Sequence, residues 1–292
     1  MLALLSWSNF GVHPSSFDPS FKFVSSPFVS PATLAALRLL VALYALCTIC
    51  TDLGFNVHYG AGDSFLSYFT VLSYIGLTAY YWAAAVQTFF YARYGSYPLR
   101  RWPQALQAGH VVLQSTIVSF PFITTIVFWS LLSSGDTFST TFSAWSNISI
   151  HALNTPFALF DLLFTNVPPA PWLALPIHIL FLACYLGVAY ITHHTQGFYV
   201  YSFLDPQEQG ALLAAYVIGI AAGGIILFSL SRGVAVLRQR WASRRGLIPA
   251  SDEEEGTSEA IDDWEEVGRP ADEREERDLE AGKKEGRESP RR

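Results

Sequence analysis

A threonine and a histidine stand out because each lies inside an otherwise apolar stretch of the chain. Thr70 is in the run LSYFTVLSY, residues 66–74, and His151 is in the run WSNISIHALNTP, residues 145–156. Histidine can act as a general base near neutral pH, and a threonine hydroxyl becomes a nucleophile once a base takes its proton. The pair therefore indicates hydrolysis or acyl transfer. A purely structural interpretation stays open beside it, since membrane threonines often bond to their own helix and membrane histidines often bridge helices.

Polar residues accompany both side chains at helical spacing. They form two stripes: Asn147, His151, Asn154 and Thr155 on one predicted helix, and Ser67, Thr70, Ser73 and Tyr74 on another. Stripes of this kind face the interior of a helix bundle or a wet cavity. Within them, Asn147, Asn154 and Ser67 are candidates to orient the imidazole or to stabilise an oxyanion.

The histidines also permit a different chemistry, the binding of two haem groups. His151 with His193 or His194 would lie near one membrane surface, and His110 with His178 near the other. Histidine pairs at two depths are typical of di-haem electron-transfer proteins. This alternative gives Thr70 no role. Only the fifth predicted helix would supply histidines at both membrane depths.

Six apolar segments have the length, or nearly the length, to span a bilayer, where a helix needs about 20 residues. They cover roughly residues 32–51, 66–91, 108–133, 147–164, 172–192 and 210–231. Unpaired backbone groups are not tolerated in lipid, and the alternating pattern of a β-barrel is absent, so each segment is predicted to be a helix. We expect an all-α, polytopic membrane protein with six transmembrane helices.

Outside the C-terminal tail, lysine and arginine residues lie on one side of the predicted membrane, with Arg38 just inside the start of the first span. Loops 52–65, 134–146 and 193–209 contain none, so the positive-inside rule predicts that both termini are cytosolic. Thr70 and His151 would then lie about four residues below the same non-cytosolic surface, which is roughly 6 Å. The sequence does not show whether their helices touch. The endoplasmic reticulum and the plasma membrane are both open as locations.

Charge divides the chain into four parts. Residues 246–292 hold 17 of the 24 acidic residues and 8 of the 18 lysines and arginines, and such a tail is expected to be disordered. The predicted parts are a cytosolic N-terminal segment 1–31, the six-helix domain 32–231, a basic juxtamembrane segment 232–245 and the acidic tail 246–292. No nucleic-acid motif is present, so membrane lipids are the expected partners.

Three smaller predictions concern single residue types. Cys47, Cys50 and Cys184 lie in apolar runs and indicate helix packing rather than a disulfide framework or a metal site. Asp161 is expected to pair with an arginine near the cytosolic surface. The aromatic residues of segment 198–203 are expected to form an interfacial belt.

Three motifs resemble the androgen-induced protein family, which includes the androgen-dependent TFPI-regulating protein. YFT at Tyr68–Thr70 is similar to the family's Tyr-Leu-Thr, and WSNISIH at Trp145–His151 is similar to its Trp-x-Asn-x-x-x-His. GFYVYSFLD at Gly197–Asp205 is similar to its Gly-x-x-Val-Tyr-x-Phe-Leu-acidic segment, with serine at 202 where many animal members have proline. The resemblance covers about residues 32–231, and the tail and third motif look like those of fungal members.

The resemblance implies a six-helix threonine hydrolase that acts on fatty acid esters of hydroxy fatty acids. Thr70 falls on the family's nucleophile and His151 on its catalytic histidine, while His193, which also has a family counterpart, is a candidate substrate or oxyanion residue. We therefore expect a lipid ester to form an acyl-threonine that water then releases, with no cofactor. A haem-binding oxidoreductase and a non-catalytic lipid-binding or signalling protein are the alternatives.

Overall fold

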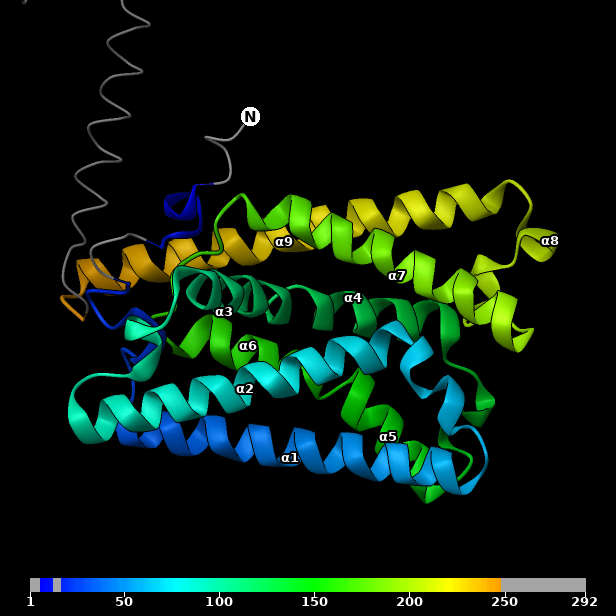
Figure 1. Ribbon diagram of the computed structural model, residues 1–292, viewed down its shortest axis with the longest axis horizontal. Helices are drawn as coiled ribbons and strands as arrows, with labels where there is room; N and C mark the ends of the chain where they lie inside the picture. The colour runs from blue at the N-terminus through cyan, green and yellow to red at the C-terminus, as the bar shows by residue number, and fades with distance from the viewer. Residues whose placement is uncertain (1–5, 13–16, 248–292) are drawn as a thin grey trace, which may run out of the picture. The chain divides into compact units, whose positions relative to one another are not determined.

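The apolar runs fold into helices that lie side by side in a bundle (Figure 1). The computed structural model describes residues 6–12 and 17–247, and it has no strand in that part of the chain. Its α-helices are α1 Pro31–His58, α2 Phe69–Tyr94, α3 Gln104–Ile117, α4 Phe120–Val127, α5 Thr141–His151, α6 Asn154–Phe164, α7 Ala174–Gln196, α8 Pro206–Gln209 and α9 Leu212–Arg244. Most of the predicted acidic tail lies outside the described residues.

Among the described residues, five helical segments are long and apolar enough to cross a membrane. They are Pro31–His58, Phe69–Tyr94, Gln104–Leu132, Ala174–Gln196 and Leu212–Arg244. The all-α, multi-pass class is therefore confirmed. The outer helices α7 and α9 leave large apolar side chains exposed, including Leu180, Ile218 and Leu230, as expected for surfaces that contact lipid.

The fourth predicted span, residues 147–164, is two short helices and not one. α5 ends at His151, and α6 begins at Asn154. Pro156 has no N–H to donate to the carbonyl of Ala152, so a continuous helix is interrupted at this point. The prediction of one polar stripe through both halves is wrong, because the residues before and after the break lie on different helices.

Side chains of the neighbouring span compensate for this break. The N–H of Thr155, which would reach the His151 carbonyl in a continuous helix, bonds to Ala152 instead. The His151 carbonyl accepts hydrogen bonds from Thr125 Oγ1 at 2.8 Å and from Trp129 Nε1 at 3.0 Å. Interrupted helices are tolerated in membranes when neighbours satisfy the freed backbone groups in this way.

The third span is irregular as well. α3 ends at Ile117, α4 begins at Phe120 with Pro121 in its first turn, and the π-helix η6, Phe128–Leu132, continues α4. Wide π-helical turns inside membrane helices often lie at functional sites. Here the irregular third and fourth spans contact each other through α4 and α6.

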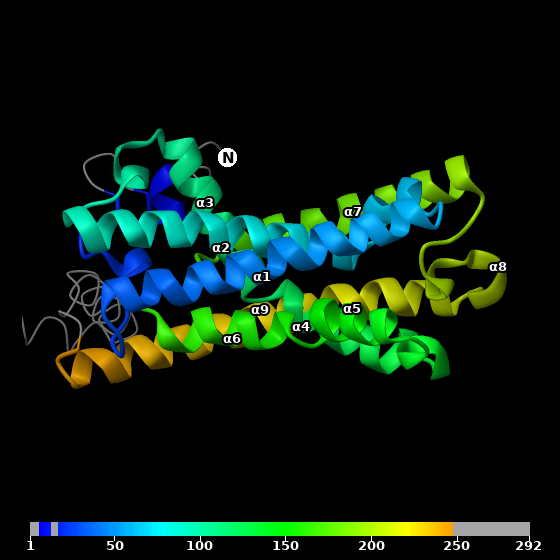
Figure 2. The same cartoon turned by 90° about the horizontal axis from the view of Figure 1, so that it is seen from below.

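The helices form layers around these two broken spans. Figure 1 shows α1 beside α2 on one side and α7 beside α9 on the other, with α3, α4 and α6 between them. Figure 2 shows α5 and α6 following one another along the side that also holds α9. The extensive contact between α1 and α2 makes this antiparallel pair one wall of the bundle.

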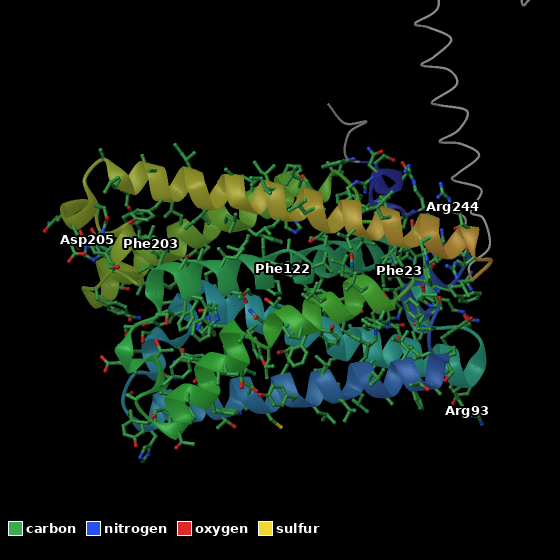
Figure 3. The ribbon with its side chains drawn as sticks, turned by 180° about the vertical axis from the view of Figure 1, so that it is seen from behind. Phe23, Arg93, Phe122, Phe203, Asp205 and Arg244 are labelled. Carbon is green, nitrogen blue, oxygen red and sulfur yellow. The ribbon has the colours of Figure 1, made fainter. Side chains whose placement is uncertain are left out.

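The two ends of the bundle differ in composition. Figure 3 shows Arg93 and Arg244 at one end, together with Phe23, and Asp205 and Phe203 at the other. We refer to them as the basic end and the loop end. Thr70, near the start of α2, lies at the loop end. Which end faces the cytosol stays a prediction.

Candidate functional site

Thr70 is the second residue of α2, at a helix start that has no side-chain cap. The 3-10 helix η4, Gly62–Ser67, leads to Tyr68, which takes the N-cap position in an extended conformation. The first hydrogen bond of the helix runs from Leu72 N–H to the Tyr68 carbonyl. The amides of the three residues before Leu72 therefore need acceptors outside the helix. This helix end carries partial positive charge and favours an anion or an oxyanion.

The loop between α7 and α9 brings a tyrosine hydroxyl to this helix end. Tyr201 lies with Thr70 and Tyr185 in the wall of one cavity, and hydrogen bonding to Thr70, Tyr185 and Phe69 partly offsets the effect of burial on its pKa. Its ring stacks on Phe203, with centroids 5.1 Å apart. Burial raises the pKa of Tyr201 above its ordinary value of about 10, so this hydroxyl keeps its proton at neutral pH.

Tyr201 was predicted to belong to an interfacial belt, and the structure instead turns it toward α2. Tyr185 of α7, which the sequence did not single out, belongs to the same hydroxyl cluster. It donates a hydrogen bond to the Ser67 carbonyl at 3.2 Å. The Ser67 hydroxyl accepts from Thr192 Oγ1 at 2.9 Å. α7 is thus bonded to the segment that precedes Thr70.

An apolar cavity of about 250 Å³ lies beside Thr70, between α2, α4, α7 and α9. The polar residues in its wall are Thr70, Thr124, Tyr185 and Tyr201. The other wall residues are Phe69, Ile123, Val127, Leu132, Ile179, Leu182, Ala183, Leu186, Phe203, Leu204, Val217, Ile220 and Ala221. Pockets for whole small molecules typically measure about 300–1,000 Å³, so this cavity suits part of an alkyl chain.

His151, the predicted base, lies at the C-terminal end of α5 and is buried. Its ring stacks face to face on Phe128, with centroids 3.6 Å apart and planes 4° apart. Within the described part of the chain, its Nδ1 atom has no hydrogen-bond partner. His151 is not a wall residue of the cavity. Among the described residues, no hydrogen bond joins the His151 and Thr70 side chains. α2 and α5 contact one another, but direct proton transfer between the two side chains stays a prediction.

Both candidate asparagines have structural partners. Asn154 donates to Thr124 Oγ1 at 2.7 Å and accepts from Thr125 Oγ1 at 2.9 Å, so it fastens α6 to α4. Asn147 donates to the Thr137 carbonyl at 3.0 Å and so holds α5 to the preceding loop. The structure brings neither amide to the hydroxyl cluster around Thr70.

The other histidines have ring contacts of their own. His193 stacks on Tyr199 with centroids 3.8 Å apart. His178 has its ring nitrogens 2.7 Å from the Ala174 carbonyl and 3.1 Å from the Ser115 carbonyl. A neutral imidazole has one N–H and carbonyl oxygens only accept, so His178 in its neutral form donates to one of these two carbonyls.

A second buried polar cluster lies toward the basic end. Arg38 donates from Nη2 to Asp161 Oδ1 at 2.8 Å, and from Nη1 to Thr88 Oγ1 and the Phe23 carbonyl, each at 2.8 Å. Tyr80 donates to Asp161 Oδ2 at 2.6 Å. The predicted pairing of Asp161 with an arginine is confirmed, and the partner is Arg38. The cluster fastens α1, α2 and α6 together.

Comparison with known proteins identifies the family. Neither the curated proteins nor the solved structures give a match. The family model for FAR-17a/AIG1-like protein matches residues 32–234, a range that overlaps every spanning segment and includes all three sequence motifs. The resemblance to the androgen-induced proteins is thereby confirmed, and the chain belongs to the FAR-17a/AIG1-like family.

Proposed function

We propose that this membrane protein is a lipid ester hydrolase with Thr70 as its nucleophile. The observation that carries the proposal is the position of the Thr70 hydroxyl. It lies in the wall of an apolar cavity, at the uncapped N-terminus of α2. A fatty acyl chain in the cavity would bring its ester carbonyl to a hydroxyl group and to a helix end that stabilises negative charge.

The proposed reaction has two steps. Thr70 Oγ1 attacks the ester carbonyl, its proton passes to His151, and the alcohol leaves with a proton as the acyl-threonine forms. Water then attacks the acyl-threonine, the carbon–threonine oxygen bond breaks, and the fatty acid is released. The substrate class is a fatty acid ester of a hydroxy fatty acid or a related lipid ester.

His151 is proposed as the base because it is a buried imidazole with a free Nδ1 atom. The side chain has to be reoriented relative to its stack on Phe128 before it reaches the threonine. Catalytic hydrogen bonds commonly tighten only when substrate is bound. Contact between α2 and α5 supports this assignment, because it places the two helices side by side.

Fluorophosphonate labelling of the purified protein tests this proposal. The probe should phosphonylate Thr70, and mass spectrometry of the digested protein should find it on the peptide that contains this residue. Thr70→Val keeps the shape and removes the hydroxyl, so it should abolish labelling and ester hydrolysis. Thr70→Ser keeps a hydroxyl and should retain part of both.

Thr78→Val is the matched control. The Thr78 hydroxyl belongs to the same helix and donates only to its own Tyr74 carbonyl at 2.8 Å, so this variant should label and hydrolyse like the wild type. Folded Thr70→Val that still hydrolyses the ester would exclude threonine as the nucleophile. Wild-type protein that binds the lipid but is neither labelled nor active would favour a lipid-binding function.

A further inference from the structure

We propose that the basic end of the bundle binds the phosphate group of an anionic lipid. The site consists of Gln114 of α3 and of Arg232 and Arg238 of α9, around a small cavity where these helices meet the loop between α6 and α7. This cavity shares no wall residue with the cavity beside Thr70. The inference is therefore independent of the proposed hydrolase function.

Arg232 and Arg238 carry positive charges that no described carboxylate neutralises. Both belong to the C-terminal part of α9, at the basic end (Figure 3), and Arg238 is 9% exposed. Their guanidinium groups donate to the backbone carbonyls of Leu162, Val167 and Ala170. Within the described residues, the ion pair is that of Arg38 with Asp161. Carbonyl oxygens satisfy the N–H groups of the two α9 arginines but leave their charges without an anion, which is costly for a buried group.

A buried glutamine beside these arginines has no partner of its own. Gln114 is 4% exposed and lies in the wall of the same cavity. In the described part of the chain, its side-chain amide makes no hydrogen bond. A buried amide without a partner destabilises a protein unless something bonds to it. The free space beside it is about 10 Å³, which is roughly the room that one water molecule or one phosphate oxygen occupies.

The donors around this space favour an anion over water. Guanidinium groups only donate, and the Gln114 amide can turn its NH₂ group to the cavity. The Ser231 hydroxyl of the wall already donates to the Val118 carbonyl at 2.6 Å. A water molecule would satisfy Gln114 but would leave both arginine charges in place. A phosphate oxygen does both, and arginine pairs with phosphate especially well.

The surroundings of the cavity indicate that the phosphate belongs to a lipid. Arg232 is half-buried, and its guanidinium carbon lies 4.9 Å from the ring centroid of the exposed Trp172. Tryptophan and arginine at such positions are typical of the headgroup level of a membrane. Leu230 and Leu237 of α9 are exposed on either side of Arg232 in the chain. They offer an apolar surface to the acyl chains of a lipid whose headgroup is at Arg232.

Thermal unfolding of the detergent-purified full-length protein tests the inference. Dioctanoyl phosphatidic acid, a soluble anionic lipid, should raise Tm by roughly 5–10 °C at about 100 times its Kd. Dioctanoyl phosphatidylcholine, whose headgroup has no net charge, should give a much smaller increase. Inorganic phosphate should also have little effect, because it has no chains to contact the apolar surface of α9.

Gln114→Leu is the most informative variant. It replaces an unpaired buried amide with an apolar side chain of similar size, so Tm without lipid should be unchanged or higher. The increase caused by phosphatidic acid should fall to less than about half of the wild-type value, because the bound oxygen loses a donor. A glutamine with only a structural role would give the opposite pattern, a lower Tm without lipid and an unchanged response to lipid.

Two arginine variants of α9 form a matched pair. Arg232→Met removes a charge from the cavity wall and should abolish most of the response to phosphatidic acid. Arg240→Met removes a charge from an exposed position on the same helix, outside the wall, and should keep the response. If Arg232→Met does not fold, the comparison of Gln114→Leu with Arg240→Met remains decisive.

Four results would overturn the inference. A wild-type response to phosphatidic acid in folded Gln114→Leu would exclude this cavity as the site. Equal losses in Arg232→Met and Arg240→Met would indicate general attraction between charges. An equal increase with phosphatidylcholine would remove the need for an anionic headgroup. An equal increase with inorganic phosphate would exclude a lipid as the source of the phosphate.

Discussion

Replacing Asp161 with leucine should destabilise the protein strongly, because the change leaves the Arg38 guanidinium buried without a counter-charge. Arg38 and Asp161 are both 0% exposed, and their Nη2 and Oδ1 atoms are 2.8 Å apart. Removal of one partner from a buried ion pair costs roughly 3–5 kcal/mol in free energy of unfolding. Arginine does not lose its proton in proteins, so the Arg38 guanidinium stays charged in a buried site without a carboxylate beside it.

Arg38→Met should cost less than Asp161→Leu. It leaves a carboxylate, which can take up a proton, and Tyr80 still donates to Asp161 Oδ2 at 2.6 Å. The double variant replaces both charges with apolar side chains, an exchange that is often close to neutral for buried pairs. It still leaves the Phe23 carbonyl without its arginine donor. The double variant should therefore unfold at a higher temperature than Asp161→Leu alone.

Thermal unfolding in detergent, followed by intrinsic tryptophan fluorescence, measures these differences. A loss of 3–5 kcal/mol corresponds to a Tm decrease of roughly 6–20 °C for a folded region of about 150–250 residues. Asp63→Leu, at an exposed carboxylate, is the control and should change Tm by less than about 2 °C. The reasoning fails if Asp161→Leu matches that control, or if the double variant loses as much as both single variants together.

Two other predictions concern the proposed hydrolase site. Ala221→Phe places a large side chain in the cavity wall, so kcat/KM for long-chain esters should fall by about tenfold or more. Short-chain esters should be little affected, and competition between two chain lengths in one assay measures the difference. His151→Ala should lower kcat by at least about 10²-fold. The double variant with Thr70→Val should be no worse than the worse single variant, because the two residues act in one step.

The sequence predicted the features of the fold that depend on composition. Long apolar runs predicted the spanning helices, and confinement of lysine and arginine to alternate loops agrees with the basic end seen in Figure 3. It did not predict the two-helix form of the fourth span. A proline leaves freed backbone groups in any helix, and whether the helix bends or separates depends on what satisfies those groups. Here Thr125 and Trp129 of another span do so.

The candidate site was predictable only in its local part. The motif around Thr70 placed it near a helix start, which is where it lies. The partners of the asparagines were not predictable, because Asn154 bonds to residues about 30 positions away in the chain. Tyr201 lies 131 positions after Thr70, and its place in the same cavity wall depends on how the loop folds back toward α2.

The two polar clusters differ in their surroundings: one joins buried helices, and the other lies beside a cavity. At the basic end, Arg38 and Asp161 neutralise one another within fully buried surroundings, so the cluster holds helices together and offers no charge to a ligand. At the loop end, the start of α2 has no cap, and hydroxyl groups collect there beside an apolar cavity. The uncapped start of α2 leaves its partial positive charge beside the cavity. Under the proposed function, a capping serine or aspartate at position 68 would offset part of that positive charge and so disfavour an oxyanion in the cavity.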